Sequence, residues 1–538
     1  MEKKSRKEMS EEEEKVIREK IINKSAKSRL IGTDKNGIMD LILSNTKIDY
    51  TNGDNNNTES GHHKICSELF KEIESDEFFV YIDNCETYMG YNNNEKPYFE
   101  PFINQTVNKD SEALYYLHCS IVTYKMLDYD YTIKHLREKR ILEYIGYKPY
   151  FIEFVIPVYE DGKTECNIEI GENTKQELLD FRKPHWFKAR YINEAEKENS
   201  KAPYVNGKLV ECASPINFKE GCLEIVDANP NEKDIEKEIN EIYAASSFAS
   251  SNEVNTVLAN RIKQKLDIAR AYNVGHGNFL YLKSNDDKTN MIYDIGYITE
   301  LQNMQKRQAN KAAILIKPSI VIISHWDCDH YYGAYANKEL MEVPWIAPDC
   351  AENGYIAAKR LIRFLKYSNE MYLVERLHST KPSVANNQPF AELILQNKKT
   401  NAIFKLEIYR GSGKETNITS KNCEGLVVKI TNGDIITLMC GDVPYSCLPD
   451  TLTNKKCYNY LIVPHHCREM SVTKLKSIYS VENAIICEGD KVANNHYDTL
   501  SNDLKSDIHF TYEAKLSIDF RLDESKPIVI VNCGGDHI

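Results

Sequence analysis

The chain has 538 residues, of which 42% are hydrophobic and 28% charged, a composition typical of a soluble globular protein. Its length allows two or more domains, and its formal net charge of -12 excludes a global basic character suited to nucleic acid or an anionic membrane. No apolar run approaches the roughly 18 residues of a membrane helix, and the basic start is followed by acids instead of an apolar segment. The 15 cysteines include no Cys-x-x-Cys pair. This pattern predicts reduced thiols in a cytoplasmic protein without a membrane partner.

The N-terminal half is predicted to contain two parts without a recognisable active site. Residues 1–63 should form a charged helix, with the acids of 11–14 preceding bases, and then a flexible Asn- and Gly-rich loop. Residues 64–254 should form a separate mixed α+β domain, because 78–82 and 150–156 have the aromatic and β-branched composition of strands. We expect a regulatory or targeting role for this half, through a protein partner.

Residues 255–538 form the third predicted part, in which short strands and helices alternate. A helix is expected at 255–269. Further helical or strand patterns are found, in chain order, at 271–282, 291–296, 320–323, 357–367, 404–409, 425–430, 435–440, 460–463 and 484–487. Most of these are short apolar runs that end in polar residues, as strands of a buried sheet do.

The densest group of polar side chains follows the apolar run at 320–323. There, Ser-His-Trp-Asp-Cys-Asp-His at 324–330 carries two imidazoles and two carboxylates within six residues. Later strands end in further groups of metal-ligand type, namely Asp442, the pair His465 and His466, and a loop with His496 and Asp498. Several strand ends that direct such groups to one edge of a sheet describe an enzyme site.

A set of six or seven nitrogen and oxygen ligands with a bridging carboxylate can hold two divalent metal ions. Imidazoles mixed with several carboxylates suit Zn or Mn, and Fe is also compatible. Two ions about 3.5–4 Å apart can share a hydroxide and hold a phosphate for in-line displacement.

These motifs resemble the metallo-β-lactamase superfamily, and in particular its ComEC-type, competence-related hydrolase domains. The resemblance covers about residues 270–500. It is carried by Asn-Val-Gly-His-Gly-Asn at 273–278, Asp-Ile-Gly at 294–296, the histidine-rich motif at 324–330, Cys-Gly-Asp at 440–442 and Val-Pro-His-His at 463–466. Cys467 stands where the family has a glycine, and the membrane channel of competence proteins is missing, so DNA uptake is not implied.

The resemblance implies an α/β fold, an αββα sandwich with the metal site at one edge of its two sheets. It places His325 and Asp327 on one ion, Asp329 and His330 on the other, and Asp442 between them. Either His465 or His466 would complete the second site, and either His496 or Asp498 would face inward. Asn422 stands near the position where the family has an Asn or His.

The function favoured by these features is a metal-dependent hydrolase of phosphodiesters, a nuclease or nucleotide phosphodiesterase that uses a metal-bound hydroxide. Its substrate would be nucleic acid or a nucleotide. Asp327 or Asp329 would orient the hydroxide and accept its proton, and His465 or His466 would stabilise the leaving oxygen. A carboxylate at 327, where a histidine is commoner, favours phosphodiester over lactam chemistry.

Two alternatives stay open at this point. One is hydrolysis of an ester, thioester or lactam by the same fold, and the other is a sensor or scaffold that keeps metal for structure alone. By analogy with ComEC-like effector domains, a role in phage defence is a further expectation.

Overall fold

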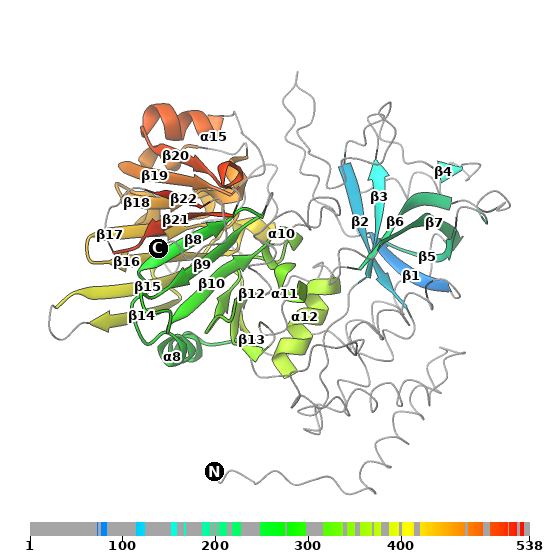
Figure 1. The fold of residues 1–538 in the computed structure, drawn as a ribbon, viewed down its shortest axis with the longest axis horizontal. Coiled ribbons are helices and arrows are strands. Elements are labelled where there is room, and N and C mark those ends of the chain that lie inside the picture. The colour runs from blue at the N-terminus through cyan, green and yellow to red at the C-terminus, as the bar shows by residue number, and fades with distance from the viewer. Residues whose placement is uncertain are drawn as a thin grey trace, which may run out of the picture. The chain divides into compact units, whose positions relative to one another are not determined.

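Figure 1 shows the fold in a computed structural model of the chain. The structure describes residues 73, 77–82, 115–123, 152–158, 166–167, 185–193, 196, 202, 204–211, 218–227, 248–274, 277–296, 316–336, 340, 342–349, 356–367, 371–377, 387–396, 401–413, 420–468, 472–487, 495–514, 516–523 and 528–531. The chain divides into two compact units, one with strands β1–β7 and one with all elements from α8 onward. The predicted helix and loop of residues 1–63 lie outside the described residues.

The N-terminal unit contains one sheet in the order β3-β2-β1-β5-β7-β6-β4, in which β3 also pairs with β6. Its strands are β1 (Glu77–Ile82), β2 (Tyr115–Val122), β3 (Ile152–Val158), β4 (Cys166–Asn167), β5 (His185–Ile192), β6 (Tyr204–Glu211) and β7 (Phe218–Asp227). Because β3 pairs on both of its edges, the sheet curves back on itself around buried aromatic side chains such as Phe78, Phe154 and Phe187. The strands predicted at 78–82 and 150–156 are confirmed as β1 and β3.

Two sheets build the C-terminal unit, as the predicted sandwich requires. The first has the order β13-β12-β11-β10-β9-β8-β21-β22 and the second β14-β15-β16-β17-β18-β19-β20. The first sheet consists of β8 (Ile268–Tyr272), β9 (Phe279–Lys283), β10 (Asn290–Ile295), β11 (Val321–Ile322), β12 (Trp345–Pro348), β13 (Met371–Val374), β21 (Ser517–Arg521) and β22 (Val529–Val531). The second consists of β14 (Ala391–Gln396), β15 (Ile403–Arg410), β16 (Leu426–Asn432), β17 (Ile435–Met439), β18 (Cys457–Ile462), β19 (Ser480–Ile486) and β20 (Asp507–Phe510).

Each of these sheets has one antiparallel and one parallel part. Strands β10–β13 run parallel to one another, and so do β17–β20. Parallel strands carry their carboxyl ends to the same edge of a sheet, where α/β proteins place their ligands. The site described below lies at these ends.

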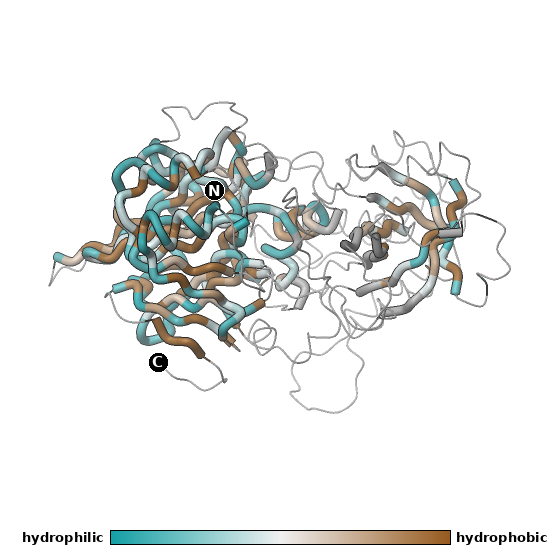
Figure 2. Tube along the Cα trace, turned by 90° about the horizontal axis from the view of Figure 1, so that it is seen from above, coloured by the Kyte–Doolittle hydropathy of each residue, from teal (hydrophilic) through white to brown (hydrophobic). Residues whose placement is uncertain are grey.

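A single hydrophobic core joins the inner faces of the two sheets. It contains Leu282 and Ile322 of the first sheet and Leu406, Val428 and Ile462 of the second, all almost fully buried. In Figure 2 brown, hydrophobic segments run through the C-terminal unit. A second apolar cluster, which includes Leu438 and Leu461, extends to the short helices η5 (Tyr445–Cys447) and α14 (Asp450–Thr453). Apolar residues therefore cover both faces of β17 and β18, which is why 435–440 and 460–463 appear in the sequence as continuous apolar runs.

Short helices connect the strands of the C-terminal unit. They are α8 (Ser251–Arg261), α10 (Cys328–Tyr331), α11 (Gly333–Ala336), α12 (Ile356–Tyr367), α13 (Ser420–Cys423), η5 (Tyr445–Cys447), α14 (Asp450–Thr453), η6 (Pro464–Cys467), η7 (Leu475–Ser477), α15 (Asn495–Asp498), η8 (Thr499–Asp503) and η9 (Thr511–Glu513). The helix predicted at 357–367 is confirmed as α12. None of the helices described is long and apolar enough to cross a membrane.

The helix predicted at 255–269 is placed wrongly, since α8 covers Ser251–Arg261 and β8 begins at Ile268. Ser250 and Glu253 form a capping box, in which the Ser250 hydroxyl accepts from Glu253 N and the Glu253 carboxylate accepts from Ser250 N. This signal of a helix start is visible in the sequence as Ser-x-x-Glu. The predicted domain boundary at 254/255 therefore falls inside a helix.

Candidate metal centre

The predicted ligand residues of these motifs follow three strands, one in the first sheet and two neighbouring strands in the second. His325 and Asp327 lie in the loop after β11, and Asp329 and His330 lie in α10 directly beyond it. Asp442 follows β17, and the pair at 465–466 lies in η6 after β18. The two sheets are held together beneath these residues by Tyr293 of β10, whose hydroxyl lies 2.9 Å from Leu426 O and 3.1 Å from Met439 O.

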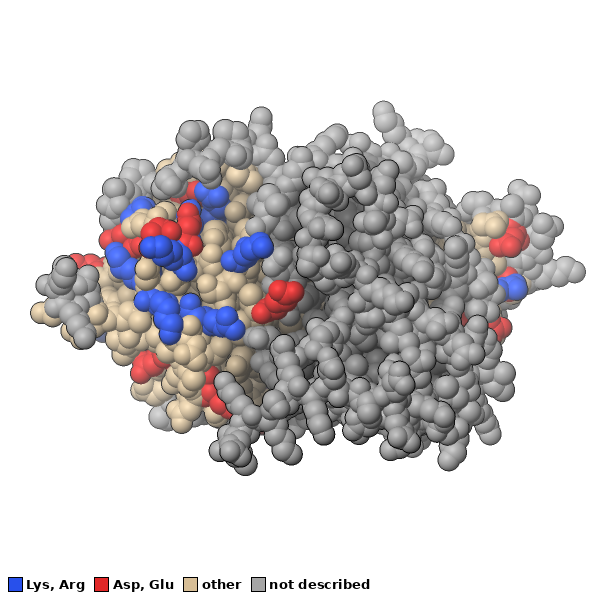
Figure 3. Space-filling model, turned by 60° about the horizontal axis from the view of Figure 1, so that its bottom comes forward, with Lys and Arg blue, Asp and Glu red and all other residues tan. Residues whose placement is uncertain are grey.

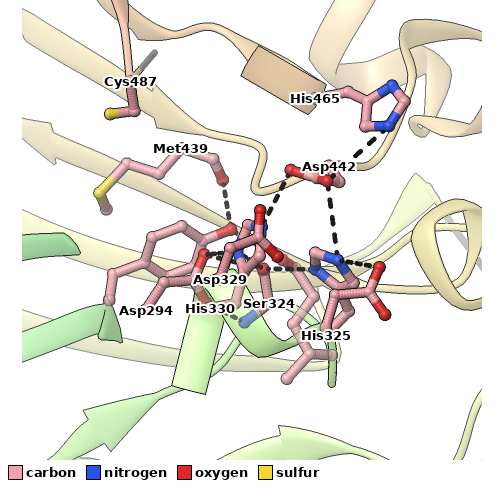
Figure 4. A network of polar contacts seen from close by, with 12 residues as sticks. Asp294, Ser324, His325, Asp329, His330, Met439, Asp442, His465 and Cys487 are labelled. Carbon is pink, nitrogen blue, oxygen red and sulfur yellow. Dashed lines mark hydrogen bonds and ion pairs between the residues drawn. The ribbon is translucent and has the colours of Figure 1, made fainter. Parts of the chain in front are cut away.

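The two carboxylate oxygens of Asp442 face two different groups of side chains (Figure 4). Its Oδ1 lies 3.2 Å from His330 Nε2 and 3.6 Å from His466 Nε2. Its Oδ2 lies 3.7 Å from His325 Nε2 and 4.0 Å from His465 Nε2. A fully buried carboxylate between two sets of imidazoles has the arrangement of a bridging ligand.

The other two carboxylates of the motif contact these imidazoles. Asp329 Oδ2 lies 3.1 Å from His466 Nε2 and 3.7 Å from His330 Nε2, and Asp327 Oδ2 lies 3.1 Å from His325 Nε2. Two sets of ligand atoms are close enough to share an ion, namely His325, His330 and Asp442, and Asp329, His330 and His466. Of the two adjacent histidines of η6, His466 is therefore the one that lies in the same set of ligand atoms as Asp329.

The hydrogen bonds of His330 and His466 determine which nitrogen of each imidazole faces the carboxylates. His466 Nδ1 lies 2.6 Å from the carbonyl oxygen of Cys487, which can only accept, so Nδ1 carries the hydrogen. His330 Nδ1 lies 2.9 Å from Asp294 Oδ2 and donates to that carboxylate. In the neutral form of both rings, Nε2 therefore presents a lone pair.

His325 is oriented in the same way through a serine. The Ser324 hydroxyl lies 2.8 Å from Asp294 Oδ2 and 3.0 Å from His325 Nδ1. Because its single hydrogen goes to the carboxylate, the hydroxyl accepts from His325 Nδ1, and His325 Nε2 is left with its lone pair. Asp294 thus orients two ligand imidazoles, one directly and one through Ser324.

This donor set fits divalent metal ions. Three imidazole lone pairs face three carboxylates in a site where none of the six residues is more than 5% exposed. His330 Nε2 and Asp442 Oδ1 are enclosed and 3.2 Å apart without forming a hydrogen bond. Buried acceptors that face each other repel unless a cation lies among them, and the cation is either a metal or additional protons.

The charges of the site shift the pKa values of its members strongly. Burial alone would lower the pKa of His330, but the carboxylates of Asp442, Asp329 and Asp294 outweigh it and hold that pKa well above its usual value. Burial would raise the pKa of Asp442, but His330, His466 and other imidazoles hold it well below the usual range. The carboxylates therefore stabilise the protonated imidazoles, and the imidazoles stabilise the ionised carboxylates. A bound metal ion would stabilise the ionised carboxylates together with neutral imidazoles.

Asp294 is the functional residue whose role the sequence did not reveal. It lies at a bulge in β10 with a φ of 54°, and its Oδ1 accepts from Ser324 N at 2.6 Å. The Asp-Ile-Gly motif was recognisable, but the contact of its aspartate with His330 depends on where β10 and α10 meet. A non-glycine residue at positive φ is a backbone strain that commonly marks functional sites.

Two glycines of the recognised motifs hold the backbone of Asp329. A Cβ atom on Gly296 or on Gly277 would overlap the Asp329 carbonyl oxygen. That oxygen accepts from Asn278 N at 3.2 Å, and Asn278 O accepts from Gly296 N at 2.6 Å. Both motifs therefore serve to fix the start of α10, which carries two ligands.

His465 lies at the edge of the centre, on the Oδ2 side of Asp442. Its side chain is 12% exposed, against 0% for His466. Burial lowers the pKa of His465 to about 4, so the ring is neutral at neutral pH. Asn422 Nδ2 lies 3.5 Å from Asp442 Oδ2 on the same side, at the position the resemblance suggested.

His496 and Asp498 do not join either group of ligand atoms. His496 is buried, its Nε2 lies 3.0 Å from the Tyr445 hydroxyl, and burial lowers its pKa to about 3. Asp498 is exposed on α15. Of the two, His496 faces inward, and its role as a metal ligand stays a prediction.

The turn that carries the histidine pair has an unusual backbone. His465, His466 and Cys467 have φ values of 50°, 52° and 61°, in the left-handed region. Cys467 thus adopts the conformation for which a glycine is preferred, at a cost of about 1–2 kcal/mol. His465 N donates to Gly441 O at 3.1 Å, which ties this turn to the residue before Asp442.

Replacing Asp294 with Asn is expected to lower metal affinity by about 10- to 100-fold. The Asn amide would place N–H groups against Ser324 and His330 Nδ1, and would favour the tautomer of His330 in which Nε2 carries the hydrogen. Competition against a chromogenic chelator measures the effect. Asp286→Asn is the matched control, because Asp286 also accepts from a serine hydroxyl and a backbone N–H but lies in a surface turn. Equal affinities of the two variants would contradict the role given to Asp294.

No protein-family model and no curated protein matches the chain. Among solved structures, human tRNase Z, short form, is similar at 14% sequence identity, over 37% of this chain and 77% of that one, with a TM-score of 0.20. Zn(2+)-bound PqqB from Methylobacterium extorquens is similar at 9% identity, over 46% and 98%, with a TM-score of 0.27. CmlA, a diiron β-hydroxylase from Streptomyces venezuelae, is similar at 10% identity, over 64% and 66%, with a TM-score of 0.26. Values this low carry no inference about the reaction, which has to come from the residues.

Proposed function

We propose that the C-terminal unit is a metal-dependent hydrolase of phosphodiesters, with nucleic acid or a nucleotide as its substrate. The observation that supports this most is the position of Asp442, whose two oxygens each face a different group of imidazoles and carboxylates. These residues would hold a pair of divalent cations, which would lower the pKa of a bound water and offset the charge of a phosphate. Three carboxylates in the donor set favour hard cations, which bind phosphate oxygens well.

The roles of the side chains follow from their contacts. Asp327 contacts His325 at the outer end of the motif and is placed to accept the proton of the attacking water. His466 donates from Nδ1 to Cys487 O, and its Nε2 lies 3.1 Å from Asp329 Oδ2. Its Nε2 is therefore assigned to metal binding. His465 is neutral and partly exposed, and we assign to it the hydrogen bond to the leaving oxygen.

A substrate panel tests this proposal directly. The full chain, supplied with Mn or Zn, is incubated with bis(p-nitrophenyl) phosphate, single- and double-stranded DNA, RNA and cyclic nucleotides. We expect metal-dependent cleavage of a diester that is lost in Asp329→Ala/His330→Ala and kept in Asp498→Ala. A p-nitrophenyl ester and a chromogenic β-lactam are run in parallel. Hydrolysis of these alone, or diester cleavage that survives the double substitution, would rule the proposal out.

A further inference from the structure

Recognition of a polyanion by a broad basic surface is not supported on the face shown in Figure 3. Lysines and arginines of the C-terminal unit lie there among acidic residues. In the same unit, Lys265 contacts Asp267 and Asp523. An anionic group of the substrate can instead be bound by an individual residue close to the metal centre.

Arg376 is a buried cation that the mechanism above does not use. It follows β13, it is 7% exposed, and its Nε lies 3.5 Å from Glu424 Oε2. That nitrogen is enclosed and makes no hydrogen bond, and within the described parts of the chain Glu424 is the charged partner of the guanidinium. A guanidinium has five N–H donors and stays charged at all pH values reached in proteins. Arg376 therefore has donors for a further anion.

The register of the parallel strands places Arg376 at the edge of the sheet that carries the metal centre. Ile322 of β11 is in register with Ile346 of β12, and Ile346 with Tyr372 of β13. The loop with Trp326 and the segment with Arg376 therefore leave the sheet at the same level, two strand spacings or about 10 Å apart. Trp326 Nε1 donates to Pro348 O at 2.7 Å, so the ligand loop extends over the end of the strand between them.

The segment that holds Glu424 also contacts the metal centre. Asn422, two residues before it, reaches Asp442 at 3.5 Å, and Leu426, two residues after it, donates its backbone N–H to Ser324 O at 2.8 Å. The Arg376–Glu424 pair thus adjoins the group on the Oδ2 side of Asp442, where His325 and the partly exposed His465 lie.

From this placement we infer that Arg376 binds a second phosphate of the substrate, next to the scissile one, and that Glu424 holds the guanidinium in position. This inference rests on the proposed phosphodiester hydrolysis. The planar fork of an arginine matches two phosphate oxygens, and the segments that carry Arg376 and the ligand loop leave the sheet at the same edge. The substrate class is accordingly a nucleotide or oligonucleotide with at least two phosphates, in preference to an isolated diester.

Two small substrates test this with the intact protein, namely thymidine 5′-(p-nitrophenyl phosphate) and the same diester with a 3′-phosphate. We expect the wild type to show a KM about tenfold lower for the substrate with the second phosphate, as one charged hydrogen-bonded contact would give. Equal KM values would overturn the role of Arg376 and leave the proposed function intact. Hydrolysis of neither substrate by a protein that cleaves another diester of the panel would overturn this inference alone, whereas cleavage of no diester at all would overturn the proposed function as well.

Substitutions separate anion binding from a structural role. Arg376→Lys should raise KM about tenfold for the substrate with two phosphates, with kcat unchanged and with KM for the simple diester within about twofold. The double variant Arg376→Gln/Glu424→Gln leaves no unpaired charge and should show the same selective loss. Arg410→Lys is the control, since Arg410 donates to the neighbouring Glu375 O and stacks on Phe390. Equal losses on both substrates would show that Arg376 is merely structural.

Discussion

Asp442→Asn is expected to abolish the binding of both metal ions and to lower hydrolysis of a diester by about 100-fold or more. Asn has the size of Asp, so the buried position stays filled. It keeps one acceptor oxygen and turns the other into an NH₂ group that would point at imidazole lone pairs on one side of the centre. Because each oxygen of Asp442 faces its own group of ligands, one substitution affects both ion positions.

Elemental analysis of the purified variant and a titration with Mn or Zn measure this effect. We expect about two equivalents of metal in the wild type and less than one in the variant, as a bridging ligand predicts. Asp498→Asn is the matched control, since it removes an exposed carboxylate of the same half of the chain. Two tightly bound equivalents in Asp442→Asn would show that this residue does not bridge.

The candidate ligands that directly follow apolar runs could be predicted from the sequence, because the end of a strand determines where the next few residues lie. The apolar run at 320–323 ends in His325 and its neighbours, and the run at 435–440 ends in Asp442. The parallel pairing of β10 with β11 and of β17 with β18 then brings these strand ends to common edges. The local sequence pattern does not reveal which strands pair. The position of Asp442 between the imidazoles of His325 and His330 could therefore be seen only in the folded structure.

The sequence could not decide between His465 and His466, because adjacent residues of a turn point in directions that depend on its φ and ψ angles. Here both are left-handed, and only His466 reaches the Cys487 carbonyl and Asp329. The role of Asp294 was hidden for a similar reason, since its partner His330 lies 36 residues later. Tertiary contacts of this kind have no local signature.

The start of α8 could have been found from the sequence. The Ser-x-x-Glu pattern at 250–253 is a local signal of the helix start, whereas the predicted range 255–269 began too late and extended into β8. In the N-terminal half, aromatic and β-branched content predicted β1 and β3, since composition is informative for buried strands. No ligand-type cluster pointed to a role for that sheet.

Gly441→Ala is expected to be far more damaging than Gly433→Ala, although both glycines have nearly the same backbone conformation. Their φ values are 56° and 61°, so alanine at either position costs about 1–2 kcal/mol of stability from backbone strain alone. At Gly433 a Cβ atom would meet nothing within 4 Å, whereas at Gly441 it would overlap Cβ and Oγ of Ser324. That overlap should cost about 1–3 kcal/mol more.

Comparison of the two variants separates the effect of the overlap with Ser324 from that of backbone strain. Ser324 in turn contacts residues of the metal centre. Displacement of Ser324 would disturb its hydrogen bonds to Asp294 and His325, so that Gly441→Ala should lose metal affinity as well as stability. Urea unfolding in the presence of a chelator gives the free energy of unfolding, and metal titration gives the affinity. We expect Gly433→Ala to bind metal like the wild type. Equal stability losses with unchanged metal affinity in both variants would mean that the close packing of Gly441 on Ser324 does not position the ligands.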